Sequence, residues 1–182
     1  PAAVMTDKND PQTLQIKANI QHLMKNGKLK VLDYGAGKGR LLSNIINSLD
    51  GETSEFTKAF DYVAFDKYDI DRTDCIKLIE KVYGNAENRY FNDMNTLLAS
   101  HDKGSFNVVI MCNVLHEIDP KEWLNLFKKT QGQIVSLLAS DGILLHVEDT
   151  QMPIGEKAFQ NGFIVLDTPH IKDLFDIKQE VD

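Results

Sequence analysis

Three glycines in five residues follow a short apolar segment near the start of the chain. Gly35, Gly37 and Gly39 come directly after residues 31–34, and leucine and isoleucine then recur at helical spacing over residues 41–46. The order of strand, glycine turn and helix is typical of a nucleotide-binding loop, because glycine lets the backbone reverse sharply and approach a ligand closely. The spacing is G-x-G-x-G, whereas the dinucleotide fingerprint is G-x-G-x-x-G.

Carboxylates stand at the ends of the two apolar segments nearest this turn. Asp33 lies two residues before the first glycine, where it would repel a pyrophosphate and would suit a ligand with a cationic amino-acid end. Asp66 directly follows the apolar segment 62–65. Nucleotide-binding α/β folds bind ribose hydroxyls with an acid at this place, and the two oxygens of one carboxylate can accept from both hydroxyls.

The most continuous apolar segment of the chain, residues 106–112, is followed by Asn-Val-Leu-His-Glu-Ile at 113–118. Continuous apolarity predicts a central parallel strand that is buried on both faces. If a reaction at this place requires a nucleophile to lose a proton, His116 is the natural candidate for the general base, because its unperturbed pKa lies near neutrality. Glu148 and Asp149 end the segment 143–149, where they could also reach a substrate, since ligands of open α/β sheets bind beyond the carboxyl ends of the strands.

Taken in order, these segments resemble the motifs of the class I S-adenosylmethionine-dependent methyltransferases. Residues 33–39 are similar to the first motif of that family and residues 113–118 to the fourth. The resemblance implies S-adenosylmethionine as the cofactor. It implies a cofactor site formed by Asp33, Gly35, Ala36, Gly37, Gly39, Asp66, Lys67, Asp93, Met94, Cys112 and Asn113.

The resemblance also assigns roles within that site. Asp93 would accept from the adenine amino group, with Met94 packed on the ring. The backbone around Cys112 and Asn113 would meet the methionine end of the cofactor. His116 and Glu117 would lie on the segment that faces the methyl group, which makes them the candidate catalytic residues. No metal site is expected.

The elements that would position these residues predict an α/β fold with a three-layer, doubly wound, mostly parallel sheet of the Rossmann-like class I methyltransferase type. We expect helices over 11–26, 39–48 and 70–83, and others starting near 95 and 121, the last with an apolar face continuing to 139. Residues 49–60 are expected as a loop or helix extension, 141–142 as a turn, and 171–175 as a last helix.

The family's sheet has seven strands, whereas only six are evident here, over 31–34, 61–65, 89–91, 106–112, 143–149 and 162–167. Three explanations stay open for the C-terminal edge. Residues 176–181 supply the missing strand, the sheet is irregular, or the domain is cut from a longer protein.

Length and composition predict a single domain with enough apolar residues to form a hydrophobic core. The chain has 182 residues, of which 42% are hydrophobic. We expect residues 1–10 to be disordered or a linker and 11–182 to form a single methyltransferase domain. Because the chain begins with Pro1 rather than Met, it is expected to be a processed protein or a domain excised from a longer chain.

The formal net charge of -7 argues against general electrostatic binding to nucleic acid or to an anionic membrane. Cys75 and Cys112 have no metal-ligand spacing, so we expect reduced core thiols in a cytoplasmic protein. No apolar segment approaches the roughly 20 residues of a membrane-spanning helix.

The predicted function is transfer of the methyl group of S-adenosylmethionine to an O, N or S atom of a small molecule or protein side chain. The sequence lacks the Asn/Asp-Pro-Pro-aromatic tetrapeptide of adenine methyltransferases and the Pro-Cys nucleophile of pyrimidine carbon methylation. Two alternatives stay open. One is an inactive methyltransferase-like module that acts through a partner or flanking domains. The other is a nicotinamide-dependent oxidoreductase, against which Asp33 and the glycine spacing argue.

Overall fold

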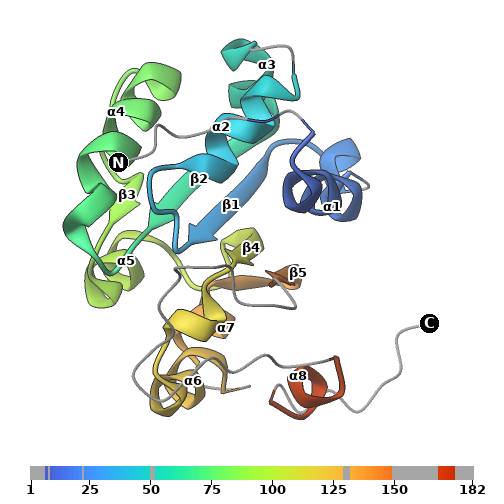
Figure 1. Cartoon of the computed structure of the whole chain (residues 1–182), viewed down its shortest axis with the longest axis vertical. Coiled ribbons are helices and arrows are strands. Elements are labelled where there is room, and N and C mark those ends of the chain that lie inside the picture. The colour runs from blue at the N-terminus through green and yellow to red at the C-terminus, as the bar shows by residue number, and fades with distance from the viewer. Residues whose placement is uncertain are drawn as a thin grey trace.

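Five parallel strands form one sheet in the order β3-β2-β1-β4-β5 (Figure 1). The structure is a computed structural model that describes residues 7, 9–21, 23–49, 52–128, 132–148 and 168–174. The strands are β1 Leu29–Tyr34, β2 Phe60–Phe65, β3 Tyr90–Phe91, β4 Phe106–Cys112 and β5 Leu138–Val147.

Helices cover both faces of this sheet and complete the three layers. The α-helices are α1 Pro11–Ile20, α2 Arg40–Asn47, α3 Thr53–Ala59, α4 Arg72–Tyr83, α5 Met94–Ser100, α6 Pro120–Phe127, α7 Gln133–Leu137 and α8 Thr168–Leu174. Short 3-10 helices are η1 Leu23–Asn26, η2 Asp69–Asp71 and η3 Leu115–Glu117. One apolar core joins α1 to α4 to one face of the sheet, and a second core joins α5 to α7 to the other.

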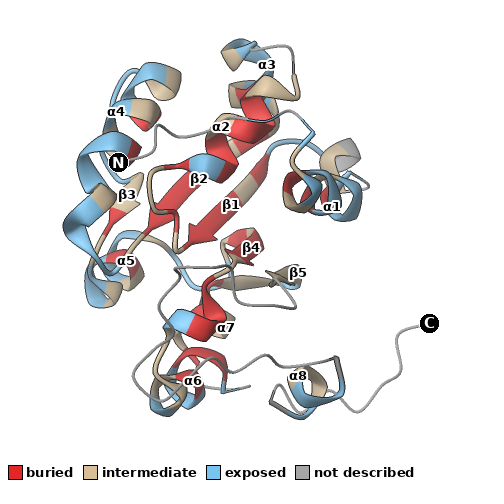
Figure 2. Cartoon of the chain, viewed as in Figure 1, coloured by how far each residue is buried: buried red, intermediate tan, exposed pale blue. Residues whose placement is uncertain are grey.

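Alternation along the strands sends neighbouring side chains into these two cores. Val31 of β1 belongs to the first core and Leu32 to the second, as the period of two in a strand requires. In β4 the residues from Val108 to Met111 are fully buried, which confirms the prediction of a central strand covered on both faces. Figure 2 shows burial concentrated in β1, β2 and β4, whereas β5 is half-buried.

The carboxyl ends of β1, β2 and β4 lie at one edge of the sheet. Tyr34 pairs with Phe65 on one side and with Met111 on the other, so the three strands end at the same level. The chain order along the sheet reverses at β1, and open α/β sheets bind their ligands at such a switch point. The glycine turn, Asp66 and the segment after β4 are therefore brought together, as the sequence predicts.

Several local expectations are wrong. Residues 53–59 form the separate helix α3 rather than a loop or an extension of α2. The helix begun near 121 ends at Phe127, and the apolar residues up to 139 belong to α7 and to the start of β5. Physically, the apolar spacing there serves two elements that pack on the same core rather than one long helix.

Residues 141–142 lie within β5 rather than in a turn. There the register with β4 breaks, so that Phe106 pairs with Leu138 and Val108 with Ile143. A Cβ on Gly142 would stand only 2.9 Å from the carbonyl oxygen of Phe106, so glycine permits this irregularity. The strand expected over 162–167 and the segment 176–181 lie outside the described residues. None of the helices in the described ranges is both long and apolar enough to cross a bilayer.

Candidate cofactor-binding and active site

A cavity of about 380 Å³ opens at the carboxyl ends of β1, β2 and β4. Its volume lies within the roughly 300–1,000 Å³ of small-molecule sites. Seven of the site residues predicted from the sequence line it: Gly35, Gly37, Asp66, Lys67, Cys112, Asn113 and Glu117. The structure therefore gathers residues from the three predicted motifs around one space.

The glycine turn forms one wall of this cavity. Gly35 has φ +85, and a Cβ there would collide with the side chain of Val114. Gly37 has φ +51, and a Cβ there would meet nothing closer than the Asp71 carboxylate at 4.0 Å. Glycine is thus required at 35 for packing, whereas at 37 a side chain would occupy the open space of the cavity.

The carboxylate of Asp66 is held by the backbone at the cavity wall. Its Oδ2 accepts from the amide of Gly37 at 2.8 Å and its Oδ1 accepts from the amide of Tyr68 at 2.9 Å. Each carboxylate oxygen has a second lone pair, so both can still accept from a ligand. This arrangement suits a pair of neighbouring hydroxyl groups.

Asp33 lies below the turn and lines a second, smaller cavity of about 40 Å³. Its side chain is only 2% exposed and accepts from the hydroxyl of Tyr62 at 2.6 Å. Burial raises its pKa to about 6, although the Tyr62 hydrogen bond acts in the opposite direction. Gly35 and Cys112 line both cavities, which places the small one next to the large one.

Cys112 stands between the two cavities as a neutral thiol. It contacts Gln12 of α1 at 3.4 Å and Arg40 of α2 at 3.5 Å. Burial raises its pKa to about 12, so the thiolate is not populated near neutral pH. Both cysteines of the chain are free thiols. Among the described residues no group of three His, Cys, Asp or Glu side chains gathers to hold a metal ion.

Glu148 fixes the segment that follows β4. Its Oε1 accepts from the amides of Val114 and Leu115 at 3.0 and 2.8 Å, and its Oε2 lies 2.7 Å from Nδ1 of His116. His116 is 4% exposed and does not line either cavity, whereas its neighbour Glu117 does line the large one. Asn113 adopts φ +56 at the bend, and its amide donates to the carbonyl of Val147.

Besides Asp33, four predicted cofactor residues do not line the large cavity. Ala36 lines the small cavity, and Gly39 is the N-cap of α2. Asp93 is exposed and caps α5, accepting from the amide and hydroxyl of Thr96 at 2.8 and 2.9 Å. These hydrogen bonds lower its pKa. Met94 is half-buried against the second core. Asp149 lies outside the described residues.

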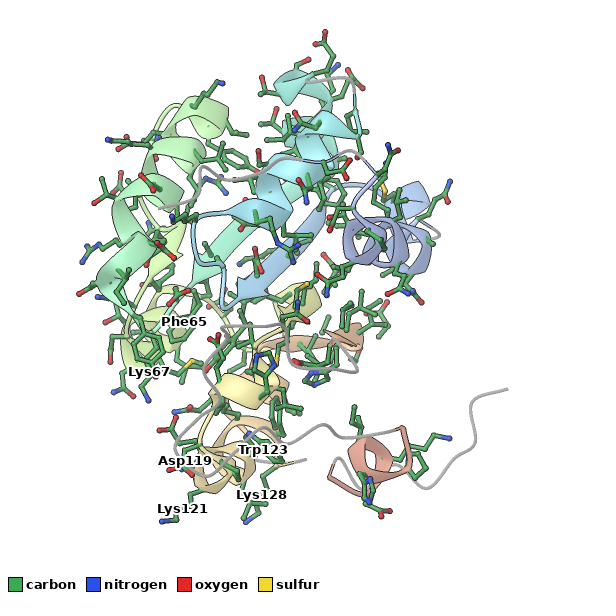
Figure 3. All side chains as sticks on the ribbon, in the orientation of Figure 1. Phe65, Lys67, Asp119, Lys121, Trp123 and Lys128 are labelled. Atoms are coloured by element: carbon green, nitrogen blue, oxygen red, sulfur yellow. The ribbon has the colours of Figure 1, made fainter. Side chains whose placement is uncertain are left out.

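A second set of cavity residues was not predicted from the sequence. Tyr34 and Phe65 stack with ring centroids 4.7 Å apart at the ends of β1 and β2. Further wall residues are Tyr68, Ile70, Asp71, Val114, Ile118, Asp119 and Glu122. Figure 3 shows Phe65 and Lys67 near the end of β2, Asp119 at the start of α6 and Trp123 on α6. Most of these wall residues lie within a few positions of a predicted site residue, mainly Asp66 or Glu117. Closeness in sequence to those two residues is therefore the signal by which they could be predicted.

A family profile described as "Methyltransferase domain" matches residues 10–179. The chain therefore belongs to this family of methyltransferase domains, whose Rossmann-like fold it has, and S-adenosylmethionine is the cofactor of the class. No curated protein matches the chain significantly.

Solved structures show the same fold at low sequence identity. The CurJ carbon methyltransferase is 21% identical, with a TM-score of 0.54 over 78% of this chain and 35% of its own. The Burkholderia thailandensis 1,6-didemethyltoxoflavin-N1-methyltransferase is 19% identical, with a TM-score of 0.50 over 78% of this chain and 52% of its own. The [4+2]-cyclase SpnF is 14% identical, with a TM-score of 0.55 over 89% of this chain and 56% of its own. The chain thus spans about a third to just over half of these proteins.

Proposed function

We propose that this domain transfers the methyl group of S-adenosylmethionine to an O, N or S atom of a small molecule or protein side chain. The observation that carries the proposal is the convergence of Gly37, Asp66 and Glu117 on one cavity at the switch point of the sheet. An acceptor of this kind fits the net charge of -7 better than nucleic acid does.

The residues around the cavity fit this cofactor. The space in front of Gly37 is a cradle that any Cβ would fill, and the Asp66 carboxylate offers two acceptors for the ribose hydroxyls. Asp33, in the adjoining small cavity, supplies a negative charge for the ammonium group of the methionine end. When bound there, the cofactor supplies an activated methyl group on a sulfonium, and the protein must orient the acceptor and exclude water.

We assign proton acceptance to Glu117, if the acceptor must lose a proton, because Glu117 is the catalytic candidate that lines the cavity. His116 stays the second candidate. Its ring lies behind the wall and contacts the Glu148 carboxylate at 2.7 Å, an anion that would stabilise a proton arriving on the imidazole. The same contact keeps the Glu117 segment in place, so we assign His116 at least a positioning role.

A second candidate function is a methyltransferase-like module that does no methyl transfer and acts through a partner or flanking domains. The burial of His116, which keeps the expected base out of the cavity, favours it. SpnF, which has this fold, is named as a [4+2]-cyclase, and cyclisation is chemistry other than methyl transfer.

The test is turnover of methyl-tritiated S-adenosylmethionine with a panel of alcohols, phenols, amines and thiols. An activated carbon acid is added, because CurJ, which has the same fold, is a carbon methyltransferase. Transfer that falls at least tenfold in Glu117→Gln, with cofactor affinity unchanged, supports the proposal. Cofactor binding without transfer to any acceptor would favour the non-catalytic module.

A further inference from the structure

An ion pair crosses the large cavity between the end of β2 and the start of α6. Nζ of Lys67 lies 3.0 and 3.3 Å from the two carboxylate oxygens of Glu122, and both residues line the cavity. Lys67 directly follows Asp66, the residue placed to hold the ribose. The two side chains are 57% and 46% exposed. An ion pair this exposed contributes little stability and is readily exchanged for contacts with a ligand.

Apolar side chains flank this pair without being covered. Tyr68 is 54% exposed and Ile70 is 90% exposed, although both line the cavity. Ile118 lines it from the segment before α6. A flat ring that entered between these walls would bury their apolar surface and would bring its polar edge to Lys67 and Glu122.

The carboxylate expected at the adenine amino group lies outside the cavity lining. Asp93 caps α5 through Thr96, is exposed and does not line the cavity. Its neighbour Asn92 donates to Asp69 at 2.9 Å, which ties the end of β3 to η2. Asp119 lines the cavity but serves as the N-cap of α6. Glu122 is the remaining carboxylate that α6 contributes to the cavity lining. Its partner, the Lys67 ammonium group, could donate to a ring nitrogen of a ligand instead.

We propose that Lys67 and Glu122 recognise the adenine edge of the cofactor, with the N6 amino group donating to Glu122 and N1 accepting from Lys67. This inference rests on the proposed function, since it requires S-adenosylmethionine in the cavity. The edge carries a donor beside an acceptor, which complements a carboxylate beside an ammonium group. The ion pair holds the two side chains together until the base replaces it.

The inference is tested by calorimetric titration with S-adenosylhomocysteine and its inosine counterpart, S-inosylhomocysteine. In the inosine compound a carbonyl oxygen replaces the amino group and N1 carries a hydrogen, so donor and acceptor are reversed. The wild-type chain should prefer the adenosine compound by about tenfold, the lower end of what a hydrogen bond to a charged group contributes. The double variant Lys67→Glu/Glu122→Lys keeps an ion pair and should reverse the preference.

Two control variants accompany the reversal. Asp93→Ser keeps an N-cap for α5 but removes the carboxylate, and it should discriminate as the wild type does. The exchange Lys58→Glu/Glu55→Lys inverts an exposed pair on α3, outside the cavity lining, and should change neither affinity.

The outcomes separate the two proposals. If neither compound binds the wild-type chain, the proposed function fails. If S-adenosylhomocysteine binds but the charge exchange leaves the preference intact, or if Asp93→Ser abolishes it, the assignment of Lys67 and Glu122 is overturned and the proposed function stands.

Discussion

Replacing Asp33 by Asn should stabilise the fold while it weakens cofactor binding. The Asp33 carboxyl is 2% exposed, and burial raises its pKa to about 6 from the ordinary 3.8. Asn has nearly the same shape and can still accept from the Tyr62 hydroxyl, which lies 2.6 Å from the carboxylate. The substitution therefore removes a buried charge and preserves its main hydrogen bond.

The magnitude follows from the pKa of the Asp33 carboxyl. A folded-state pKa of about 6 against 3.8 when unfolded means that the ionised carboxylate costs about 3 kcal/mol of stability above pH 6, at about 1.4 kcal/mol per pKa unit. Because the folded-state pKa is raised, this cost is relieved as the pH falls from 6 towards 4. Asp33→Asn should thus gain up to about 3 kcal/mol at pH 7.5 and almost nothing at pH 4.

The assay is urea unfolding of both chains at pH 7.5 and at pH 4, together with titration by S-adenosylhomocysteine at pH 7.5. Asp61→Asn is the matched control, because Asp61 lies on the next strand and forms an ion pair with Arg89 at 2.7 Å, so its loss should destabilise by about 1 kcal/mol or less. A variant Asp33→Asn that is less stable at pH 7.5 would refute the reasoning, since the ionised carboxylate would then be stabilising.

The other predictions concern the cavity wall. Gly37→Leu should abolish S-adenosylhomocysteine binding and should lower the stability of the fold by about 1–2 kcal/mol, because leucine is strained in the left-handed backbone. The control Gly84→Leu, at a glycine with φ +84 and open space around it, should have the same backbone cost and bind the compound normally. Comparable binding by both variants would contradict our placement of the site. Asp66→Ala should weaken that binding by about 1–3 kcal/mol in calorimetry, and unchanged affinity would mean that another group holds the ribose. Glu148→Ala should lower the free energy of unfolding by about 2 kcal/mol, because two backbone amides and the His116 ring lose the carboxylate that they contact. A loss of stability no larger than that of His116→Ala would show that the two amide hydrogen bonds contribute little.

The site residues that could be predicted are those fixed by local chemistry. Gly37 has a left-handed backbone and borders open space in the cavity, and Asp66 directly follows the end of a buried parallel strand. Both depend on a few neighbouring residues and on the rule that parallel strands end together. The apolar segment 106–112 likewise predicts a central strand from its own residues, without knowledge of the strands that it pairs with.

The features of the site that could not be predicted depend mostly on contacts distant in sequence. His116 is buried because Glu148, at the end of β5, binds its ring and two neighbouring amides, and that depends on the register of β5. Glu122 reaches the cavity only through the placement of α6 against the end of β2. Asp93 is different, because an Asp three residues before Thr96 is a recognisable N-cap pattern, and the resemblance to the family obscured it.

Titration of the purified chain with S-adenosylhomocysteine and, separately, with NAD tests the central claim most directly. We predict binding of one molecule of S-adenosylhomocysteine with an affinity in the micromolar range and no binding of NAD, because Asp33 and the turn at Gly37 favour a cationic amino-acid end over a pyrophosphate. Binding of NAD without S-adenosylhomocysteine, or of neither compound, would contradict the claim.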